Sequence, residues 1–114
     1  MVERCDHDPL TVILKAASDQ TRRAILTHLA QEGPTPVTEI AARFDMSLNS
    51  VSKHIIVLER AGLVSRRTQW RVHLIQVEME PLAKVDRWFE GLRSIWQLRL
   101  EALDKHLTKE TDND

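Results

Sequence analysis

The chain has 114 residues, of which 42% are hydrophobic and 29% charged, and its formal net charge is −1. This length predicts a single domain, and the composition is that of a folded globular protein, which excludes a disordered chain. No apolar run approaches the roughly 20 residues that span a bilayer, and residues 1–8 lack the apolar stretch of a signal peptide. The one cysteine, Cys5, has no partner for an internal disulfide. From these observations together we expect a cytoplasmic protein with no membrane partner.

Although the net charge of the chain is close to zero, one segment is basic. Residues 43–73 contain six basic and two acidic side chains, a surplus of four positive charges, whereas the flanking segments are slightly acidic. Salt screens charges beyond about 10 Å at 0.1 M. The acidic segments therefore do not prevent this basic segment from binding nucleic acid.

Two amphipathic helices are predicted over residues 9–32. Pro9 suits the first turn of the first helix, and Ser18 or Asp19 can cap a second helix over residues 21–31. The apolar residues of the first helix recur at helical spacing, at Leu10, Ile13, Leu14 and Ala17. The run 33–36, rich in proline and glycine, ends the second helix.

A helix-turn-helix is predicted over residues 38–61. Thr38 can cap a third helix, and the break at 45–47 separates it from a fourth helix that Ser47 caps and Gly62 ends. Two short helices joined in this way are typical of proteins that place the second helix in the major groove of DNA.

The remaining chain predicts a hairpin and one long helix. The partly alternating segments 63–67 and 72–77, joined around Thr68 and Gln69, predict a β-hairpin, which we call the wing (residues 63–78). Residues 80–108 have a helical pattern with Pro81 in the first turn, and residues 109–114 are expected to form a frayed polar tail. The predicted fold class is mainly α with a small β-hairpin, a winged helix-turn-helix in one domain over residues 1–114.

The outward face of the fourth helix is the candidate DNA-reading surface. The major groove presents donors and acceptors that short polar side chains can meet. We expect Asn49 to pair with adenine, Lys53 with guanine or a phosphate, and Val57 to contact a thymine methyl group. The wing arginines are expected to bind phosphates, which gives affinity without sequence information. The candidate DNA-binding residues are Ser47, Asn49, Ser50, Ser52, Lys53, His54, Arg60, Arg66, Arg67 and Arg71.

Four strings are similar, in order and spacing, to those of one bacterial family. They are SDQTRRAIL (18–26), FDMS (44–47), VSKHI (51–55) and LERAGLV (58–64). Together with stretches within 86–103 they resemble the ArsR family, and the resemblance extends over residues 10–107. It implies a dimeric repressor of a bacterial operon, often autoregulatory, that binds double-stranded DNA.

The chain also departs from the family pattern. Gln20 stands where proline is common, which weakens a helix start, and the wing turn lacks the usual glycine but contains Trp70. We expect Trp70 to be half-buried at the base of the wing, with packing on a DNA sugar edge as the alternative. For His54, a half-buried structural position and a contact to phosphate or base both stay open.

An apolar excess on the last helix predicts a homodimer. Residues 82–107 contain eleven large apolar side chains, more than one core-facing stripe needs in a chain too small for a deep core. In the alternative, this stripe packs only on the first helix. The family resemblance implies dimerisation through the first and last helices. The candidate interface residues are Leu10, Ile13, Leu14, Val85, Trp88, Phe89, Leu92, Trp96 and Leu103.

No metal site, cofactor or active site is expected. A thiolate site needs two or three cysteines, the third helix carries no ligand pair, and Asp104 with His106 supplies only the first half of the family's alternative site. Cys5 and His7 alone do not close a tetrahedral site, although a metal- or redox-responsive repressor that uses them stays an alternative.

An enzyme is excluded because Ser52 and His54 lie on different sides of one helix, too far apart to act as nucleophile and base. A second alternative is a protein–protein adaptor on a winged-helix scaffold, against which the three wing arginines argue. The effector is not identified by the sequence.

Overall fold

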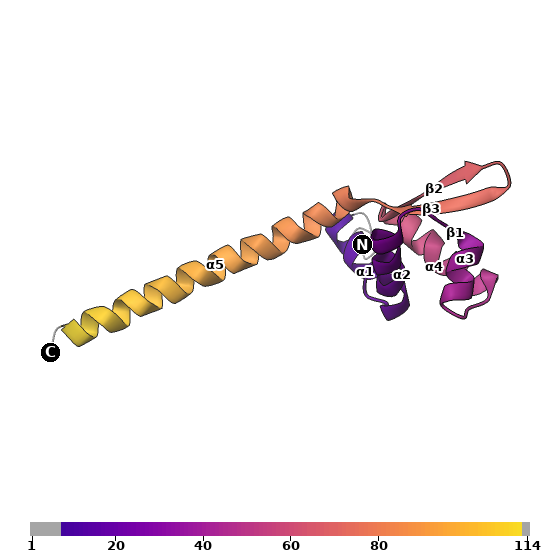
Figure 1. Ribbon diagram of the computed structural model, residues 1–114. Coiled ribbons are helices and arrows are strands. Elements are labelled where there is room, and N and C mark those ends of the chain that lie inside the picture. The colour runs from indigo at the N-terminus through magenta and orange to yellow at the C-terminus, as the bar shows by residue number, and fades with distance from the viewer. Residues whose placement is uncertain (1–7, 113–114) are drawn as a thin grey trace, which may run out of the picture.

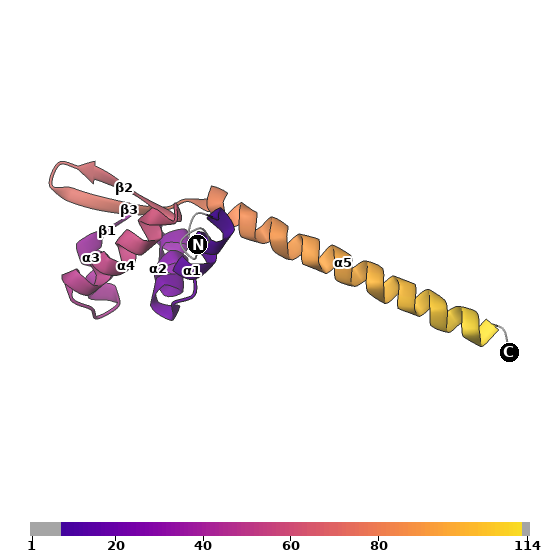
Figure 2. The ribbon, with the colours of Figure 1, turned by 180° about the vertical axis from the view of Figure 1, so that it is seen from behind.

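The computed structural model describes residues 8–112 as a small head and one long helix (Figure 1). The elements in chain order are α1 (Pro9–Ala16), α2 (Gln20–Glu32), β1 (Thr35–Pro36), α3 (Val37–Arg43), α4 (Leu48–Arg60), β2 (Val64–Gln69), β3 (Val72–Val77) and α5 (Met79–Asp112). The head contains α1 to α4 and the sheet, and α5 leaves it on the side away from the tip of the β2–β3 hairpin (Figures 1 and 2). The mainly helical winged helix-turn-helix expected from the sequence is confirmed.

Local capping chemistry sets most helix boundaries. Asp19 and Ser47 cap α2 and α4 by accepting hydrogen bonds from backbone N–H groups in the first turn, as predicted. Gly62 follows the end of α4 with a φ of +78°, the left-handed conformation that glycine adopts without penalty. The prediction for α3 was wrong: its N-cap is Pro36, without a side-chain hydrogen bond, so Thr38 lies inside the helix and does not cap it.

A third strand completes the sheet, whose order is β1-β3-β2. In β1, Thr35 pairs with Ile75 and Pro36 with Leu74 in antiparallel register. The sequence analysis missed β1 because its prolines indicated only a helix end. Proline is tolerated here because β1 is an edge strand.

The hairpin turn lies two residues beyond its expected position. The register of β2 and β3 runs from Val64 opposite Val77 to Gln69 opposite Val72. Trp70 and Arg71 therefore form the turn, whereas Thr68 and Gln69 belong to β2.

The core of the head is formed by buried aliphatic side chains from every helix of the head and from the sheet. Its fully buried large members are Ile25, Leu29, Ile40, Val51, Ile55, Leu58, Leu63 and Ile75. Ile13 is only 2% exposed and belongs to this core, so its assignment to a dimer interface is corrected: the first helix buries it against its own chain. Val57 also packs against the core but is only partly buried, so its contact to a thymine methyl group stays a prediction.

Most of the described part of α5 is exposed to solvent. Leu82 and Val85 pack against the core, but beyond them the helix is exposed through residue 108. It continues to Asp112, so the frayed tail expected from residue 109 is helical there. The radius of gyration is 20.7 Å, against about 13 Å for a compact domain of this length.

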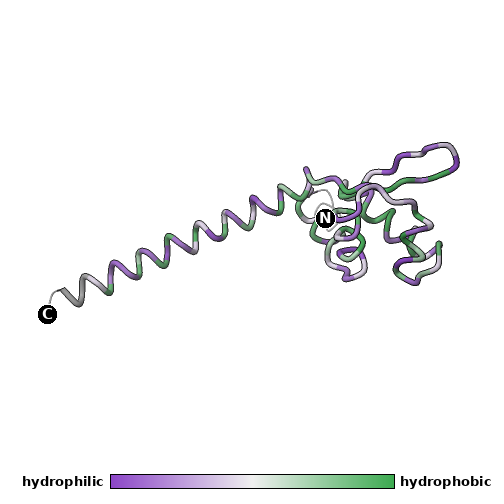
Figure 3. Tube along the Cα trace, viewed as in Figure 1, coloured by the Kyte–Doolittle hydropathy of each residue, from purple (hydrophilic) through white to green (hydrophobic). Residues whose placement is uncertain are grey.

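Hydrophobic positions recur along the coloured part of α5 (Figure 3). Among the described residues, no helix combines the length and apolarity that crossing a membrane requires.

Candidate nucleic-acid interface

The turn between α3 and α4 holds the two helices at a defined angle. After Phe44, Asp45 takes a left-handed φ of +52°, which aspartate tolerates better than most residues. The N–H groups of Asp45 and Met46 donate to the carbonyls of Ala42 and Ala41 at 3.3 and 3.0 Å. This pair of bonds satisfies the carbonyls at the end of α3 and lets α4 start at once from its Ser47 cap.

The two faces of α4 differ in character. Val51, Ile55 and Leu58 are buried on the face toward the core. The opposite face exposes Leu48, Asn49, Ser50, Lys53, Ile56 and Arg60. Ser52 is half-buried at the edge of this face. The exposed face offers short polar donors and acceptors together with cations, which are the groups that read base edges and neutralise phosphates.

A groove of about 330 Å³ separates the first half of α4 from the hairpin. Its lining residues are Pro36, Val37, Thr38, Leu48, Ser52, Arg66, Arg71, Val72 and His73. The sequence analysis missed Thr38, Leu48 and His73 as site residues. No sequence signal marks them, because it is the pairing of β1 with β3 that brings the start of α3 beside the hairpin.

The three wing arginines do not have equivalent surroundings. Arg66 donates two hydrogen bonds to Glu59 at the end of α4, from Nε at 3.2 Å and from Nη2 at 2.9 Å. These bonds raise the pKa of the Arg66 guanidinium. Arg67 lies on the other face of β2, since successive side chains alternate, and it is exposed. Arg66 therefore fastens the wing to α4, although all three wing arginines are exposed.

A second polar contact fixes the base of the wing. Glu78 lies between β3 and α5 and accepts hydrogen bonds from Ser65 Oγ at 2.6 Å and from Gln76 Nε2 at 3.2 Å. These two donors hold the pKa of Glu78 below its ordinary value. Both strands of the hairpin are thereby anchored at the point where α5 begins.

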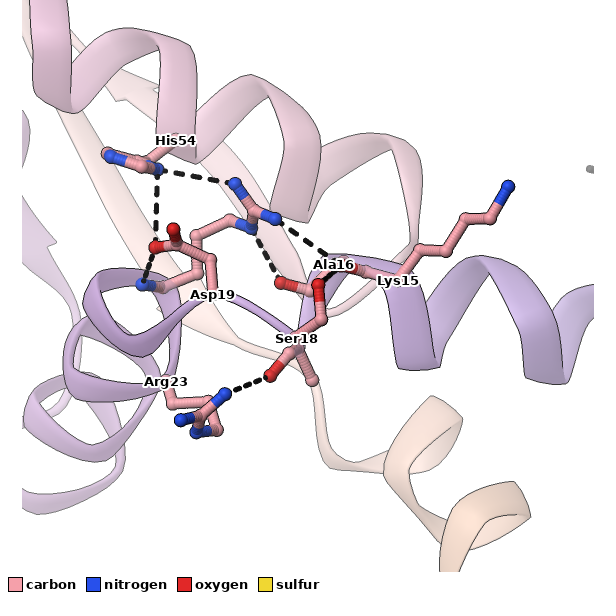
Figure 4. Close-up of polar contacts among 8 residues, drawn as sticks. Lys15, Ala16, Ser18, Asp19, Arg23 and His54 are labelled. Carbon is pink, nitrogen blue, oxygen red and sulfur yellow. Dashed lines mark hydrogen bonds and ion pairs between the residues drawn. The ribbon is translucent and has the colours of Figure 1, made fainter.

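His54 faces α2, not the exposed face of α4 (Figure 4). Its Nδ1 lies 3.4 Å from Arg22 Nη1 and 3.8 Å from Asp19 Oδ2. The same Arg22 side chain donates from Nε to the carbonyl of Ala16 at 2.6 Å. The half-buried structural alternative for His54 therefore describes its position in the head, and its contact to DNA stays a prediction.

This contact joins three helices. Arg22 reaches the end of α1, Asp19 caps α2, and His54 belongs to α4. The Arg22 backbone N–H that donates to Asp19 and the nearby charges of Arg22 and His54 hold the pKa of Asp19 below its ordinary value of 3.8. Residues 18–26, the SDQTRRAIL string, therefore contribute to the site by orienting α4 on the rest of the head.

The expectation for Trp70 was wrong. Its side chain is 87% exposed at the tip of the hairpin, not half-buried at the base. The turn lies beyond the last strand pair, where no core residue is within reach to cover an indole.

Comparisons with known proteins agree with this geometry. A family model described as a helix-turn-helix domain matches residues 17–67. The uncharacterized HTH-type transcriptional regulator YuzN of Bacillus subtilis is 33% identical over 85 residues, 68% of this chain and 92% of YuzN. A crystal structure of an ArsR family transcriptional regulator is 39% identical, has a TM-score of 0.73, and is matched over 79% of this chain and 92% of its own. The chain belongs to the ArsR family.

As an ArsR protein, the chain is a transcriptional regulator with a helix-turn-helix DNA-binding domain and not an enzyme. The HTH-type transcriptional regulator Rv2034 of Mycobacterium tuberculosis is 37% identical over 74% of this chain and 82% of its own. The solution structure of Mb0332 from Mycobacterium bovis, described as a homodimeric winged helix-turn-helix domain, is 25% identical with a TM-score of 0.64, over 81% of this chain and 84% of its own.

Only some of the candidate metal ligands of this ArsR protein belong to the described residues. Among the described side chains, those of residues 8–108, no group of three or more His, Cys, Asp and Glu is arranged to hold a metal ion. Cys5 and His7, the alternative metal or redox pair, lie outside the described residues.

Proposed function

We propose that the chain is a homodimeric, sequence-specific repressor that acts in the cytoplasm on a palindromic operator in double-stranded DNA, including one upstream of its own gene. The observation that carries the proposal is the exposed polar face of α4, capped at Ser47 and flanked across one groove by wing arginines. A helix so presented fits the major groove, while the wing cations reach the neighbouring phosphates.

Base reading is assigned to the first half of α4. Asn49, Ser50 and Lys53 are exposed there, and recognition helices contact base edges with their N-terminal residues. Asn49 can form the bidentate pair with adenine, and Lys53 can reach guanine or a phosphate. Arg60, Arg67 and Arg71, which are exposed, supply backbone contacts.

Dimerisation is assigned to one face of α5, where apolar residues repeat every 11 positions. The repeat consists of Val85, Phe89, Leu92, Trp96, Leu100, Leu103 and Leu107. An 11-residue repeat gives 3.67 residues per turn, which keeps these side chains on one side of a nearly straight helix. The face begins packed on the chain's own core at Val85 and then continues exposed.

A second copy of the chain is the occupant that best fits this face. Phe89, Leu92, Trp96 and Leu103 are between 45% and 61% exposed, an apolar surface that a monomer of this size does not leave in water. Trp88 flanks the same face, and Leu10 and Leu14 of α1 are partly exposed at its base. The homodimeric Mb0332 supports the assignment. Twofold symmetry in the protein then matches an inverted repeat in the DNA.

A dimer also explains how repression would work. Two copies of α4 bind half-sites one helical turn or a multiple apart, and a protein held there obstructs access to the promoter. Binding of the operator near its own gene makes the repression autoregulatory.

The proposal is tested with the substitution Asn49→Ala. We expect it to weaken binding to the operator by about 1–3 kcal/mol while leaving binding to random duplex DNA unchanged, because a base contact is lost but no charge is. Gln31→Ala, an exposed polar change on α2, is the control and should alter neither affinity. Equal weakening on operator and random DNA would show that this face of α4 does not read bases.

A further inference from the structure

A second apolar stripe runs along α5 beside the 11-residue repeat. Its residues, spaced alternately by three and four positions, are Trp88, Gly91, Ile95, Leu98 and Ala102, which we call the heptad stripe. This alternation is the spacing of helices that pack against each other in pairs. At 100° per residue, the centre of the heptad stripe lies about 120° around the helix from the centre of the 11-residue repeat. A partner helix that covers the repeat therefore leaves the heptad stripe uncovered.

The heptad stripe is exposed in the single chain. Trp88, Ile95 and Leu98 are 42%, 60% and 66% exposed, and Gly91 and Ala102 are exposed as well. The residues of α5 that pack on the core precede the stripe along the helix. A dimer contact on the 11-residue repeat does not account for these side chains, and an exposed apolar surface of this kind marks an interaction site.

Gly91, in the middle of the heptad stripe, does not favour a helix. Glycine inside a helix is less stable than alanine, because the unfolded chain has more conformational freedom at glycine. A Cβ added to Gly91 would meet no atom within 4 Å, so no close contact among the described residues requires glycine there. Glycine at this position instead allows a large side chain of another helix to approach the backbone of α5.

The charges beside the heptad stripe indicate the orientation of that other helix. Arg87 and Glu101 are exposed. They lie on the same side of the stripe, because they are 14 residues, or two heptads, apart. When a second copy of α5 packs antiparallel along the stripe, Arg87 of each copy lies opposite Glu101 of the other copy.

The same antiparallel register also matches the apolar residues. It places Gly91 of one copy opposite Ile95 of the other, so that the smallest residue of the stripe receives a large one, and it places Trp88 opposite Leu98. A parallel pair would instead place like residues opposite each other, with glycine facing glycine and Arg87 remote from the acidic partner. A second copy of this chain in antiparallel orientation therefore fits the stripe in size and in charge.

We propose that the heptad stripe joins two dimers into a tetramer through antiparallel pairs of α5 helices, so that one assembly holds two operators. The proposal rests on the proposed function, because the 11-residue repeat forms the dimers that the stripe then joins. Tetramers built from two kinds of twofold contact are a common closed form of homo-oligomers. Each dimer keeps its own two α4 helices and therefore its own palindromic site.

Charge reversal tests the assignment by sedimentation equilibrium of the full chain. The wild type should show a dimer–tetramer equilibrium at micromolar concentration. Arg87→Glu or Glu101→Arg alone places like charges opposite each other and should weaken tetramer formation by about tenfold or more, with the dimer dissociation constant unchanged. The double variant Arg87→Glu/Glu101→Arg restores the opposite charges and should recover the wild-type tetramer. Glu90→Arg, an exposed change on the side of α5 away from both stripes, is the control and should form tetramers like the wild type.

Bridging of DNA is the second readout. A duplex that carries half-sites selected from random DNA is immobilised, and a fluorescent copy of the same duplex is captured only when one assembly binds both. The wild type and the double variant should capture the fluorescent duplex. Either single variant should capture about tenfold less or lower still, while it binds a single duplex with unchanged affinity.

The outcomes separate this inference from the proposed function. A wild type that forms only dimers, a single reversal that leaves the tetramer intact, a double variant that does not recover it, or a control variant that loses it overturns the inference. A monomeric wild type, or one that binds the selected half-sites no better than random DNA, contradicts the proposed function instead.

Discussion

Truncation of a single leucine on α5 should show which face of the helix forms the dimer interface. Leu103 belongs to the 11-residue repeat and is 55% exposed in the single chain. Full burial of a leucine side chain contributes about 1.5–3 kcal/mol, so burying the exposed half contributes about 1 kcal/mol per copy. A twofold interface contains two copies, and Leu103→Ala should cost about 2 kcal/mol, or about 30-fold in the dimer dissociation constant.

Leu98→Ala is a matched control on the same helix. Leu98 is 66% exposed, but it lies about 140° around the helix from Leu103 at 100° per residue. Alanine and leucine are both strong helix formers, so neither change should reduce the helix content measured by circular dichroism. Leu98→Ala should leave the dissociation constant unchanged.

Sedimentation equilibrium over a concentration series measures both variants. Unchanged association of Leu103→Ala, or an equal loss for Leu98→Ala, would refute the assignment of the repeat to the interface. A wild type that is monomeric at micromolar concentration would remove the dimer altogether and favour the adaptor alternative, in which α5 binds another protein.

Three further predictions concern the head and the N-terminus. Arg67→Ala should make the slope of log affinity against log salt concentration shallower by roughly one unit on any DNA. Arg66→Ala should also loosen the wing, since it breaks the contact with Glu59. It should therefore lower the thermal midpoint of unfolding, whereas Arg67→Ala should not. The pKa of Asp19 is lowered in the folded state, so its ionised carboxylate stabilises the fold at pH values above the ordinary pKa of 3.8, and this contribution is lost as the pH falls below that value. Asp19→Asn, which keeps a cap, should flatten this part of the pH profile of stability measured by urea unfolding. An unchanged profile would contradict the linkage. Cys5→Ser should bind the operator normally with zinc, arsenite or chelator present, and a metal-induced release of DNA that the substitution abolishes would establish the alternative metal site.

The sequence predicted the elements that local chemistry determines. The caps at Asp19 and Ser47 and the turn at Gly62 depend on side chains within a few residues, and each was placed correctly. Thr35 and Pro36 were missed as a strand because their partner, β3, lies almost forty residues away, and pairing at that distance leaves no local pattern.

In the candidate site, too, only the features that depend on local geometry could be predicted. Periodicity placed Asn49 and Lys53 on the outer face of α4, which depends only on helix geometry. It could not show that Arg66 is held by Glu59, that His54 turns toward Asp19, or that Trp70 is exposed at the hairpin tip. Each of these depends on how separate elements pack, and a basic or aromatic residue has the same sequence signal whether it meets DNA or its own chain.

The most direct test of a dimeric repressor with a palindromic site is nuclease footprinting of the wild-type protein on the DNA upstream of its own gene, across a salt series. We predict protection of a twofold-symmetric stretch, with half-sites one helical turn or a multiple apart, at protein concentrations that leave random duplex DNA unprotected. Protection no stronger than on random DNA, or tight protection of a stretch without twofold character, would contradict it.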